Sequence, residues 1–280
     1  MAGSELIFLF CSMSSPRVSV IMPVYNTAAY LGEAIQSILD QSYADFEFII
    51  INDGSADHSE QIINSFNDPR IIYLSNNQNQ GLVYTLNRGV DLASGEWIAR
   101  MDGDDISLPI RFEEQMQYLH DHPYVDVLAT TIQLIDESGQ QAGIWTGDRA
   151  AILPGQILAY LPVNNCIAHP SVMVRAEVLK KFKYLEEQAQ AEDYDLWLRL
   201  AASGYVIHKL DETLLKHRII ASSFTRSRQH NVFRKLADTK FRFARRAWKS
   251  GNRGSFVYKT CYYACLDKLK AWLKPIKQKL

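Results

Sequence analysis

Three carboxylates stand within four residues at Asp102, Asp104 and Asp105, directly after a short apolar run that predicts a buried strand. Carboxylates this close repel one another unless a cation neutralises them. Mg²⁺ and Mn²⁺ prefer oxygen ligands, and they usually take one or two carboxylates together with the phosphates of a substrate. The run therefore indicates a site for a divalent metal and a diphosphate, although an acid-rich turn before a helix would give the same pattern.

Two further polar segments follow predicted strands. Pro23-Val-Tyr-Asn26 closes the first strand, and Asn52-Asp53-Gly-Ser55 closes the second. Ligands of parallel α/β sheets bind outside the carboxyl ends of the strands, and both segments would share that edge with the acidic run. Taken alone, the second segment is ordinary turn chemistry. The convergence of three strand ends favours a ligand site.

A second group of acids, Glu192, Asp193 and Asp195, opens a predicted helix. Acids at this position also stabilise the positive end of the helix dipole, so their placement has a purely structural explanation. The functional alternative is a general base, because removing a proton from a hydroxyl requires one well-placed carboxylate or histidine. Arg218, at the end of a later strand, could bind a phosphate through two hydrogen bonds or pair with a surface carboxylate.

The elements that must position these residues alternate between strand and helix. Apolar, β-branched runs predict four strands, at 18–22, 46–51, 71–74 and 97–101. Apolar residues at helical spacing lie between them, which predicts an α/β fold with a mostly parallel, doubly wound sheet flanked by helices. Beyond it we expect strands at 125–135 and 169–174 and a helix at 191–202, with a loop-rich stretch at 136–163.

Length and composition fit one large globular domain with an appendage. The chain has 280 residues, of which 47% are hydrophobic and 22% charged, and its net charge is -1. From residue 226 onward the only acids are Asp238 and Asp267, among many lysines, arginines and aromatic residues. Two basic helices are expected at 233–248 and 257–273. We expect them to contact an anionic membrane surface, the alternative being a solvated helix pair, and no nucleic acid, because no recognition motif accompanies the charge.

The cysteines and the N-terminus bear on the cellular setting. The four cysteines, at positions 11, 166, 261 and 265, show neither a C-x-x-C pair nor zinc spacing, which favours a reducing, cytoplasmic setting. The apolar run at 6–10 is shorter than the roughly 20 residues that span a bilayer. No basic residue precedes it, so a secretory signal is not expected. Residues 1–16 are expected to be a flexible N-terminus.

Taken together, these segments resemble the family 2 glycosyltransferases, which are inverting enzymes of the GT-A fold. The resemblance implies a GT-A domain at 17–225, followed by a basic, aromatic-rich helical extension at 226–280. Each matching string is modestly specific, while their order and spacing together are highly specific. The strings are Val18-Ser-Val-Ile-Met-Pro-Val-Tyr-Asn26, Ile49-Ile-Ile-Asn-Asp-Gly-Ser55, Asn79-Gln-Gly-Leu82, Ala99-Arg-Met-Asp-Gly-Asp-Asp105, Arg111-Phe-Glu-Glu-Gln115 and Glu192-Asp-Tyr-Asp-Leu-Trp197. The acidic string followed by Leu108-Pro-Ile-Arg is similar to the subgroup that builds lipopolysaccharide, capsule or other surface glycans.

The resemblance implies a donor site at the carboxyl ends of the strands. Asp53 would accept a hydrogen bond from the base, usually uracil, and Asp102 would lie near the ribose or the donor sugar. Asp104 would bind the Mn²⁺ or Mg²⁺ ion that holds the donor diphosphate, and Asp105 would begin the next helix or lie behind the metal. The nucleotide pocket would be lined by Pro23, Tyr25 and Asn26.

The implied activity is transfer of a sugar, with inversion, from a nucleoside-diphosphate sugar to a hydroxyl of a glycan or lipid-linked acceptor. The nucleotide is most often UDP. Asp193, which forms the family's Glu-Asp pair with Glu192, would be the catalytic base, and Arg218 and the metal would neutralise charge on the leaving group. One departure concerns the segment after the last core strand. Relatives often carry Tyr-Arg-x-His there, whereas this chain reads His217-Arg218-Ile219-Ile220, so Ile220 stands at the histidine position.

Two other classes remain as alternatives at this stage. A non-catalytic protein that binds nucleotide sugars would be compatible with the departure at Ile220, and it would bind a donor without turnover. A Mg²⁺-dependent phosphatase of the haloacid-dehalogenase type also uses acids at a strand end. Its Asp-x-Asp-x-Thr or Val string is not met, because position 106 is Ile and the acidic run follows the fourth strand rather than the first.

Overall fold

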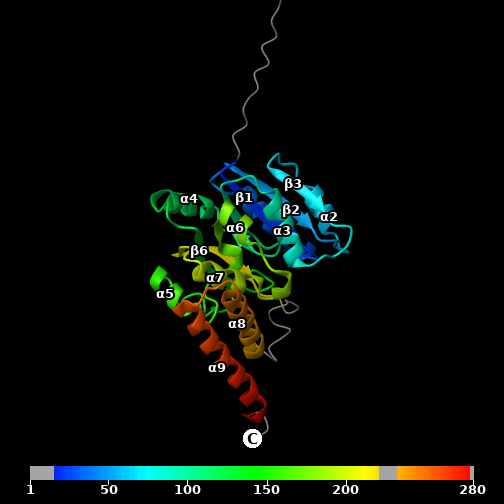
Figure 1. The fold of residues 1–280 in the computed structure, drawn as a ribbon. Helices are drawn as coiled ribbons and strands as arrows, with labels where there is room; N and C mark the ends of the chain where they lie inside the picture. The colour runs from blue at the N-terminus through cyan, green and yellow to red at the C-terminus, as the bar shows by residue number, and fades with distance from the viewer. Residues whose placement is uncertain (1–15, 221–231, 278–280) are drawn as a thin grey trace, which may run out of the picture.

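Parallel strands from the first hundred residues form one half of the central sheet in the computed structural model, which describes residues 16–220 and 232–277 (Figure 1). Strand β1 pairs in parallel with β2 on one side and β4 on the other, and β3 extends the sheet beyond β2. Val24 of β1 lies opposite Asn52 of β2, so the two strands end at the same edge. The strands are β1 (Val18–Val24), β2 (Phe46–Asn52), β3 (Ile71–Ser75) and β4 (Trp97–Arg100).

The second half of the sheet is mixed. The complete strand order is β3-β2-β1-β4-β7-β6-β8-β5. β7 runs antiparallel to both β4 and β6, β6 runs parallel to β8, and β5 runs antiparallel to β8. Parallel pairing therefore predominates, as predicted, but two strands depart from it. The strands of this half are β5 (Ile106–Ser107), β6 (Val127–Ile135), β7 (Met173–Arg175) and β8 (Ile207–Arg218).

One predicted strand is largely wrong. Residues 169–174 were expected to be extended, but His169–Ser171 form a 3-10 turn and β7 begins only at Met173. Pro170 lies inside this turn; proline lacks a backbone N–H and has a fixed φ, which suits the start of a helical turn better than a ladder.

Helices cover both faces of the sheet, because successive residues of each central strand point to opposite sides. Ile21 packs with α3, α6 and α7, whereas Val20 and Met22 pack with α1 and α4. The helices are α1 (Ala28–Leu39), α2 (Ser59–Asn64), α3 (Leu82–Leu92), α4 (Arg111–Asp121), α5 (Pro154–Tyr160), α6 (Ala176–Phe182), α7 (Glu192–Ala202), α8 (Val232–Lys249) and α9 (Ser255–Lys277), with short 3-10 turns η1 (His169–Ser171) and η2 (Glu186–Gln188).

The two basic helices predicted near the C-terminus are confirmed as α8 and α9, which lie side by side below α7 (Figure 1). Phe243 of α8 and Val257 of α9 are buried in the same core as Trp197 of α7. Lys240, fully buried, pairs with Asp267 at 2.6 Å, which ties α8 to α9. The helical extension is therefore packed into the sheet domain.

Two sequence predictions fall mostly or wholly outside the described residues. The predicted flexible N-terminus lies outside them except for Pro16, and the boundary at residue 225 falls within 221–231, which also lies outside them. Within 16–220 and 232–277, no helix is both long and apolar enough to cross a membrane. The cysteines at 166, 261 and 265 are free thiols.

Candidate active site

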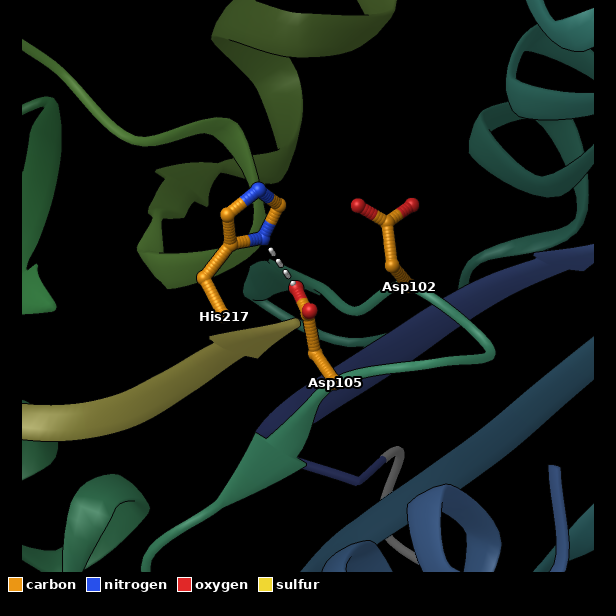
Figure 2. Close-up of side chains that lie close together, drawn as sticks. All are labelled: Asp102, Asp105 and His217. Atoms are coloured by element: carbon orange, nitrogen blue, oxygen red, sulfur yellow. Dashed lines mark hydrogen bonds and ion pairs between the residues drawn. The ribbon is translucent and has the colours of Figure 1, made fainter. Parts of the chain in front are cut away.

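The loop between β4 and β5 brings the acidic run against the end of β8. Ile106 pairs with Lys216, so the antiparallel β5–β8 ladder draws His217 next to Asp105. One ligating atom from each of Asp102, Asp105 and His217 lies within 4.8 Å of the others. Figure 2 shows the three side chains around a common space, with the two carboxylates and the imidazole directed toward it. These are two carboxylates and one imidazole that could hold a metal ion.

Asp105 is the fixed member of this group. It is fully buried, and one carboxylate oxygen lies 3.0 Å from Nδ1 of His217, while the other accepts a hydrogen bond of 2.8 Å from the backbone N–H of Arg218. Burial alone would lower the pKa of His217, but the charge of Asp105 and its hydrogen bond, followed by Asp102 and Asp104, raise that pKa to about 9. A metal ion would have to displace this proton before the imidazole could bind it.

Asp102 forms an ion pair with a buried arginine. The guanidinium of Arg100, on β4, bonds to both carboxylate oxygens of Asp102, while its Nε has no partner among the described residues. Burial raises the pKa of Asp102, and the charge of Arg100 opposes that effect. Burial, then the charges of Asp102 and Asp105, raise the pKa of Asp104 to about 7. The acidic run thus carries more negative charge than its surroundings stabilise, which fits a divalent cation.

The predicted metal ligand, Asp104, is not one of the three grouped residues. The structure brings Asp102 and Asp105 together with His217 instead, while the carboxylate of Asp104 shares their electrostatic environment. Asp102 lies just beyond the carboxyl end of β4, at the edge of the sheet where the sequence predicted the ligand site. The individual roles of these acids therefore stay predictions.

Arg218, at the end of β8, holds the backbone of the acidic loop. Its Nε donates to the backbone oxygen of Asp104 at 2.9 Å, its Nη1 to that of Asp136 at 3.1 Å, and its Nη2 to Glu33 at 2.6 Å. The guanidinium also lies 4.5 Å from the ring centre of Tyr30, and the residue is buried. Each of the three guanidinium nitrogens donates a hydrogen bond within the protein. We therefore infer that Arg218 stabilises the β4–β5 loop. Its predicted phosphate contact stays a prediction that this geometry does not favour.

Asp53 holds the loop that leads into α3. Its buried carboxylate accepts hydrogen bonds from Asn76 Nδ2 at 2.6 Å and from the backbone N–H groups of Gln80 and Gly81, each at 2.9 Å. The adjacent Gly54 has φ +68°, and a Cβ there would lie 2.6 Å from the backbone of Gln78, so only glycine fits. A carboxylate has about four acceptor positions. One remains for the predicted contact with a base.

The first two strand ends meet as predicted. Asn26 adopts φ 52°, its backbone N–H donates to Ser55 Oγ at 3.0 Å, and its side chain accepts from the N–H of Ala56 at 2.8 Å. Tyr25, beside it, is 48% exposed. Pro23 is buried within β1, which continues to Val24. Tyr25 and Asn26 therefore present their side chains at the rim, and Pro23 shapes the strand beneath them.

The second acid pair lies at the first turn of α7. Glu192 is 7% exposed, and its Oε2 has no hydrogen-bond partner among the described residues. Burial, and then the charge of Asp193, raise the pKa of Glu192 to about 7. Asp193 is half-buried and accepts a hydrogen bond of 3.0 Å from Asn165 Nδ2. Burial also raises the pKa of Asp193.

Arg100 connects the two acidic groups. Its charge lowers the pKa values of Asp102 and Asp104, and also those of Glu192 and Asp193, against the larger effect of burial in each case. The acids of the β4–β5 loop and of α7 therefore act on one guanidinium. Arg100 was not among the site residues predicted from the sequence. Its signal was a cationic residue within a buried strand, two positions before the first acid.

Comparison with known proteins identifies relatives across most of the chain. The family model described as Glycosyl transferase family 2 matches residues 19–182. An uncharacterized glycosyltransferase of Methanocaldococcus jannaschii is 37% identical over 211 residues, which is 74% of this chain and 72% of the relative. The O-antigen biosynthesis glycosyltransferase WbnJ of Escherichia coli is 35% identical over 217 residues, covering 75% and 82% of the two chains.

Solved structures share the fold at lower identity. Residues 1–349 of S. aureus TarS, in complex with UDP-GlcNAc, match with a TM-score of 0.69 at 19% identity, covering 87% of this chain and 69% of that one. The mannosyltransferase PcManGT of Pyrobaculum calidifontis, in complex with GDP-Man and Mn²⁺, matches with a TM-score of 0.62 at 16% identity, covering 92% and 76%. The predicted GT-A fold is thereby confirmed.

Proposed function

The chain belongs to glycosyl transferase family 2, and on that premise we propose that it moves a sugar from a nucleoside-diphosphate sugar to a hydroxyl of a glycan or lipid-linked acceptor. The observation that carries the proposal is the group formed by Asp102, Asp105 and His217 at the end of β8, with Asp102 bonded to the buried Arg100. The relationship to an O-antigen biosynthesis enzyme supports a role in surface polysaccharide synthesis. UDP is the expected nucleotide, since TarS, which shares the fold, binds UDP-GlcNAc.

The donor diphosphate would lie against the β4–β5 loop. Asp102, Asp105 and His217 would hold a Mn²⁺ or Mg²⁺ ion, with Asp104 as the neighbouring carboxylate, and PcManGT offers the precedent of Mn²⁺ in a related fold. A bound divalent ion neutralises charge on the leaving nucleoside diphosphate. The role of the chain is to keep these acids desolvated and fixed, through the contacts of Asp105 with β8 and of Arg218 with the loop backbone.

Asp193 would act as the general base. It is half-buried, so an acceptor hydroxyl can reach it, and Asn165 fixes one of its oxygens at 3.0 Å. The acceptor oxygen would attack the anomeric carbon as its proton passes to Asp193, while the bond to the diphosphate breaks on the opposite face. A single displacement of this kind inverts the anomeric configuration. Glu192 is more deeply buried and would position the first turn of α7. The charge of Asp193 raises the pKa of Glu192.

The test is Asp193→Asn, assayed for transfer and donor hydrolysis with UDP-GlcNAc and other nucleotide sugars in the presence of Mn²⁺. We expect kcat to fall by about 10²–10⁴, since that is the usual contribution of a general base. Donor affinity should stay nearly unchanged, because the residue lies on the acceptor side. Asp45→Asn, at an exposed carboxylate, is the matched control. Near-normal turnover by Asp193→Asn would overturn the assignment, and donor binding without turnover by the native chain would favour a binding protein.

The exposed face of α9 supports a further part of the proposal, contact with an anionic membrane. Tyr258, Tyr262 and Trp272 are 54%, 61% and 68% exposed, and Leu269 falls on the same helical stripe. Aromatic residues beside lysines suit the interfacial region of an anionic bilayer. This contact would place the enzyme on the inner face of the cytoplasmic membrane.

Surface substitutions test the membrane contact better than a truncation, because deleting α8 and α9 would also remove buried core residues. The full chain with Tyr262→Ser and Trp272→Ser should bind anionic vesicles more weakly than the native chain, at an unchanged melting temperature. Tyr124→Ser, an exposed aromatic residue between α4 and β6, provides the control. Equal vesicle binding by all three chains would remove the membrane contact from the proposal.

A further inference from the structure

A cavity of about 380 Å³ lies between the segment that precedes α7 and the first half of α8. Among the described residues that line it, three are cationic and one is acidic, namely Arg234, Lys235, Arg242 and Asp238. The remaining lining comes from Thr239 and residues 188–191. The cavity is therefore positively charged in a molecule whose net charge is only -1.

The position of these cations on α8 increases the positive potential. The first turn of α8 contains no acidic residue, although acids are the residues that normally stabilise the positive end of a helix dipole. Arg234 and Lys235 stand near that end instead. A cavity with this charge favours an anion, and arginine is particularly suited to phosphate because its planar guanidinium donates two parallel hydrogen bonds.

The cationic wall is anchored to the helix that carries the proposed base. Arg242 donates through Nη1 to the backbone oxygen of Glu187, which takes one of its five N–H donors. One turn further along α8, Arg246 bonds to the side chains of Glu187 and Asp195. These contacts fix α8 against η2 and α7, so the cavity is a built feature of the fold.

The cavity also borders the segment that leads into the first turn of α7. Gln190 and Ala191 form part of its lining and lead directly into the Glu192–Asp193 pair. The pKa of Asp193 is raised by burial and lowered by its hydrogen bonds and by Arg100, with a smaller lowering effect from Lys235. An anionic group in the cavity would therefore lie next to the turn that carries the proposed base.

We propose that this cavity binds a phosphate or diphosphate group carried by the acceptor, and thereby directs the attacking hydroxyl to Asp193. The inference rests on the proposed role of Asp193 as general base. It assigns the acceptor to the class of phosphate esters, either a lipid-linked sugar diphosphate or a soluble sugar phosphate. The donor diphosphate binds elsewhere, at the β4–β5 loop.

Binding of inorganic pyrophosphate to the full chain, measured by titration calorimetry in metal-free buffer, tests the site without requiring turnover. The double variant Arg234→Gln and Lys235→Gln should raise the Kd for pyrophosphate about tenfold, which corresponds to about 1.4 kcal/mol at 25 °C. The control is Arg245→Gln with Lys249→Gln, which removes two exposed cations from the same helix outside the cavity. An equal loss in both double variants, no loss in either, or no binding by the native chain would each overturn the proposal.

Two further probes distinguish the source of the phosphate. Tighter binding of farnesyl diphosphate than of pyrophosphate would identify a lipid-linked acceptor, whereas tighter binding of glucose 1-phosphate would identify a soluble one. Either result supports the site only if it is weakened in the Arg234/Lys235 double variant. Because binding is measured without transfer, pyrophosphate binding that depends on these residues, together with no glycosyl transfer by the native chain, would refute the proposed function and leave the anion site standing.

Discussion

Replacing Glu192 by Gln should stabilise the protein at alkaline pH and much less at acidic pH. The folded chain keeps this carboxyl buried, with Oε2 unpartnered, and its pKa is about 7 instead of the usual 4.5. Between these pH values the folded chain binds more protons at this position than the unfolded chain does. The free energy of unfolding therefore falls as pH rises through this window. Glutamine cannot ionise, so the free energy of unfolding of the variant does not fall for this reason as pH rises.

The size of the effect follows from the pKa difference. Each unit of difference between the pKa values of the folded and unfolded chain corresponds to about 1.36 kcal/mol. A rise in the pKa from 4.5 to about 7 therefore costs about 3 kcal/mol of stability once the group is ionised in both states. Between about pH 5 and about pH 8.5, about 2–3 kcal/mol of this cost should develop. The amide of glutamine has its own burial cost, but that cost is independent of pH and cancels when the two pH values are compared.

Urea denaturation of the native chain and of Glu192→Gln, at both pH values, measures this difference directly. The gap in unfolding free energy between variant and native chain should shift by about 2–3 kcal/mol in favour of the variant at the higher pH. Glu177→Gln, at an exposed position on α6, should show no such shift. If the gap for Glu192→Gln were the same at both pH values, the carboxyl would not be held in its neutral form by burial, and the electrostatic account of α7 would be refuted.

Three other substitutions test the anchoring of α8 and the metal site. Lys240→Ala leaves the buried Asp267 carboxylate with only the more distant Lys270, at 3.7 Å, so urea denaturation should show a loss of up to about 3–5 kcal/mol, largely recovered in Lys240→Met with Asp267→Leu. Phe243→Ala removes a buried ring from the shared core and should cost about 3–5 kcal/mol in a single unfolding transition; an unchanged denaturation midpoint would mean that α8 contributes nothing to that core. Asp104→Ala should weaken UDP-GlcNAc binding in the presence of Mn²⁺ and leave metal-free binding unchanged, as calorimetry would show; equal affinity to the native chain in both buffers would exclude a role for Asp104 at the metal.

The sequence predicted the parallel half of the sheet because its signals are local. Runs such as 46–51 are apolar, β-branched and bounded by turn residues, and the structure places β2 at Phe46–Asn52. The sequence predicted a strand over 169–174 but neither its start at Met173 nor its antiparallel direction. The place of β7 between β4 and β6 is set by pairing with segments distant in sequence.

The sequence predicted which acidic residues form the site, but not which residues contact them. The strand-end rule brought Asn26 and Ser55 together correctly, since both directly follow neighbouring parallel strands. His217 joins Asp105 only because β5 and β8 pair, across more than a hundred residues, and the motif position led us to look for a histidine at 220 instead. From the sequence, Arg218 could have bound a phosphate or a surface carboxylate equally well. In the structure it is buried, it pairs with the exposed carboxylate of Glu33, and it contacts the loop backbone.

The helix that carries the proposed base is held in place by the helices that follow the catalytic domain. Asp195, two residues after Asp193, is fully buried and bonds to Arg199 of its own helix at 2.8 Å, to Gln188 at 3.1 Å and to Arg246 of α8. These contacts fix the first turn of α7, where two adjacent carboxyls are desolvated at a cost in stability of about 3 kcal/mol for Glu192 alone. A turn free to move would let water reach Glu192 and return its pKa toward the ordinary value. The buried core of α8 and the Asp195–Arg246 ion pair hold this turn in place, so α8 helps to keep Glu192 out of water beside the proposed base.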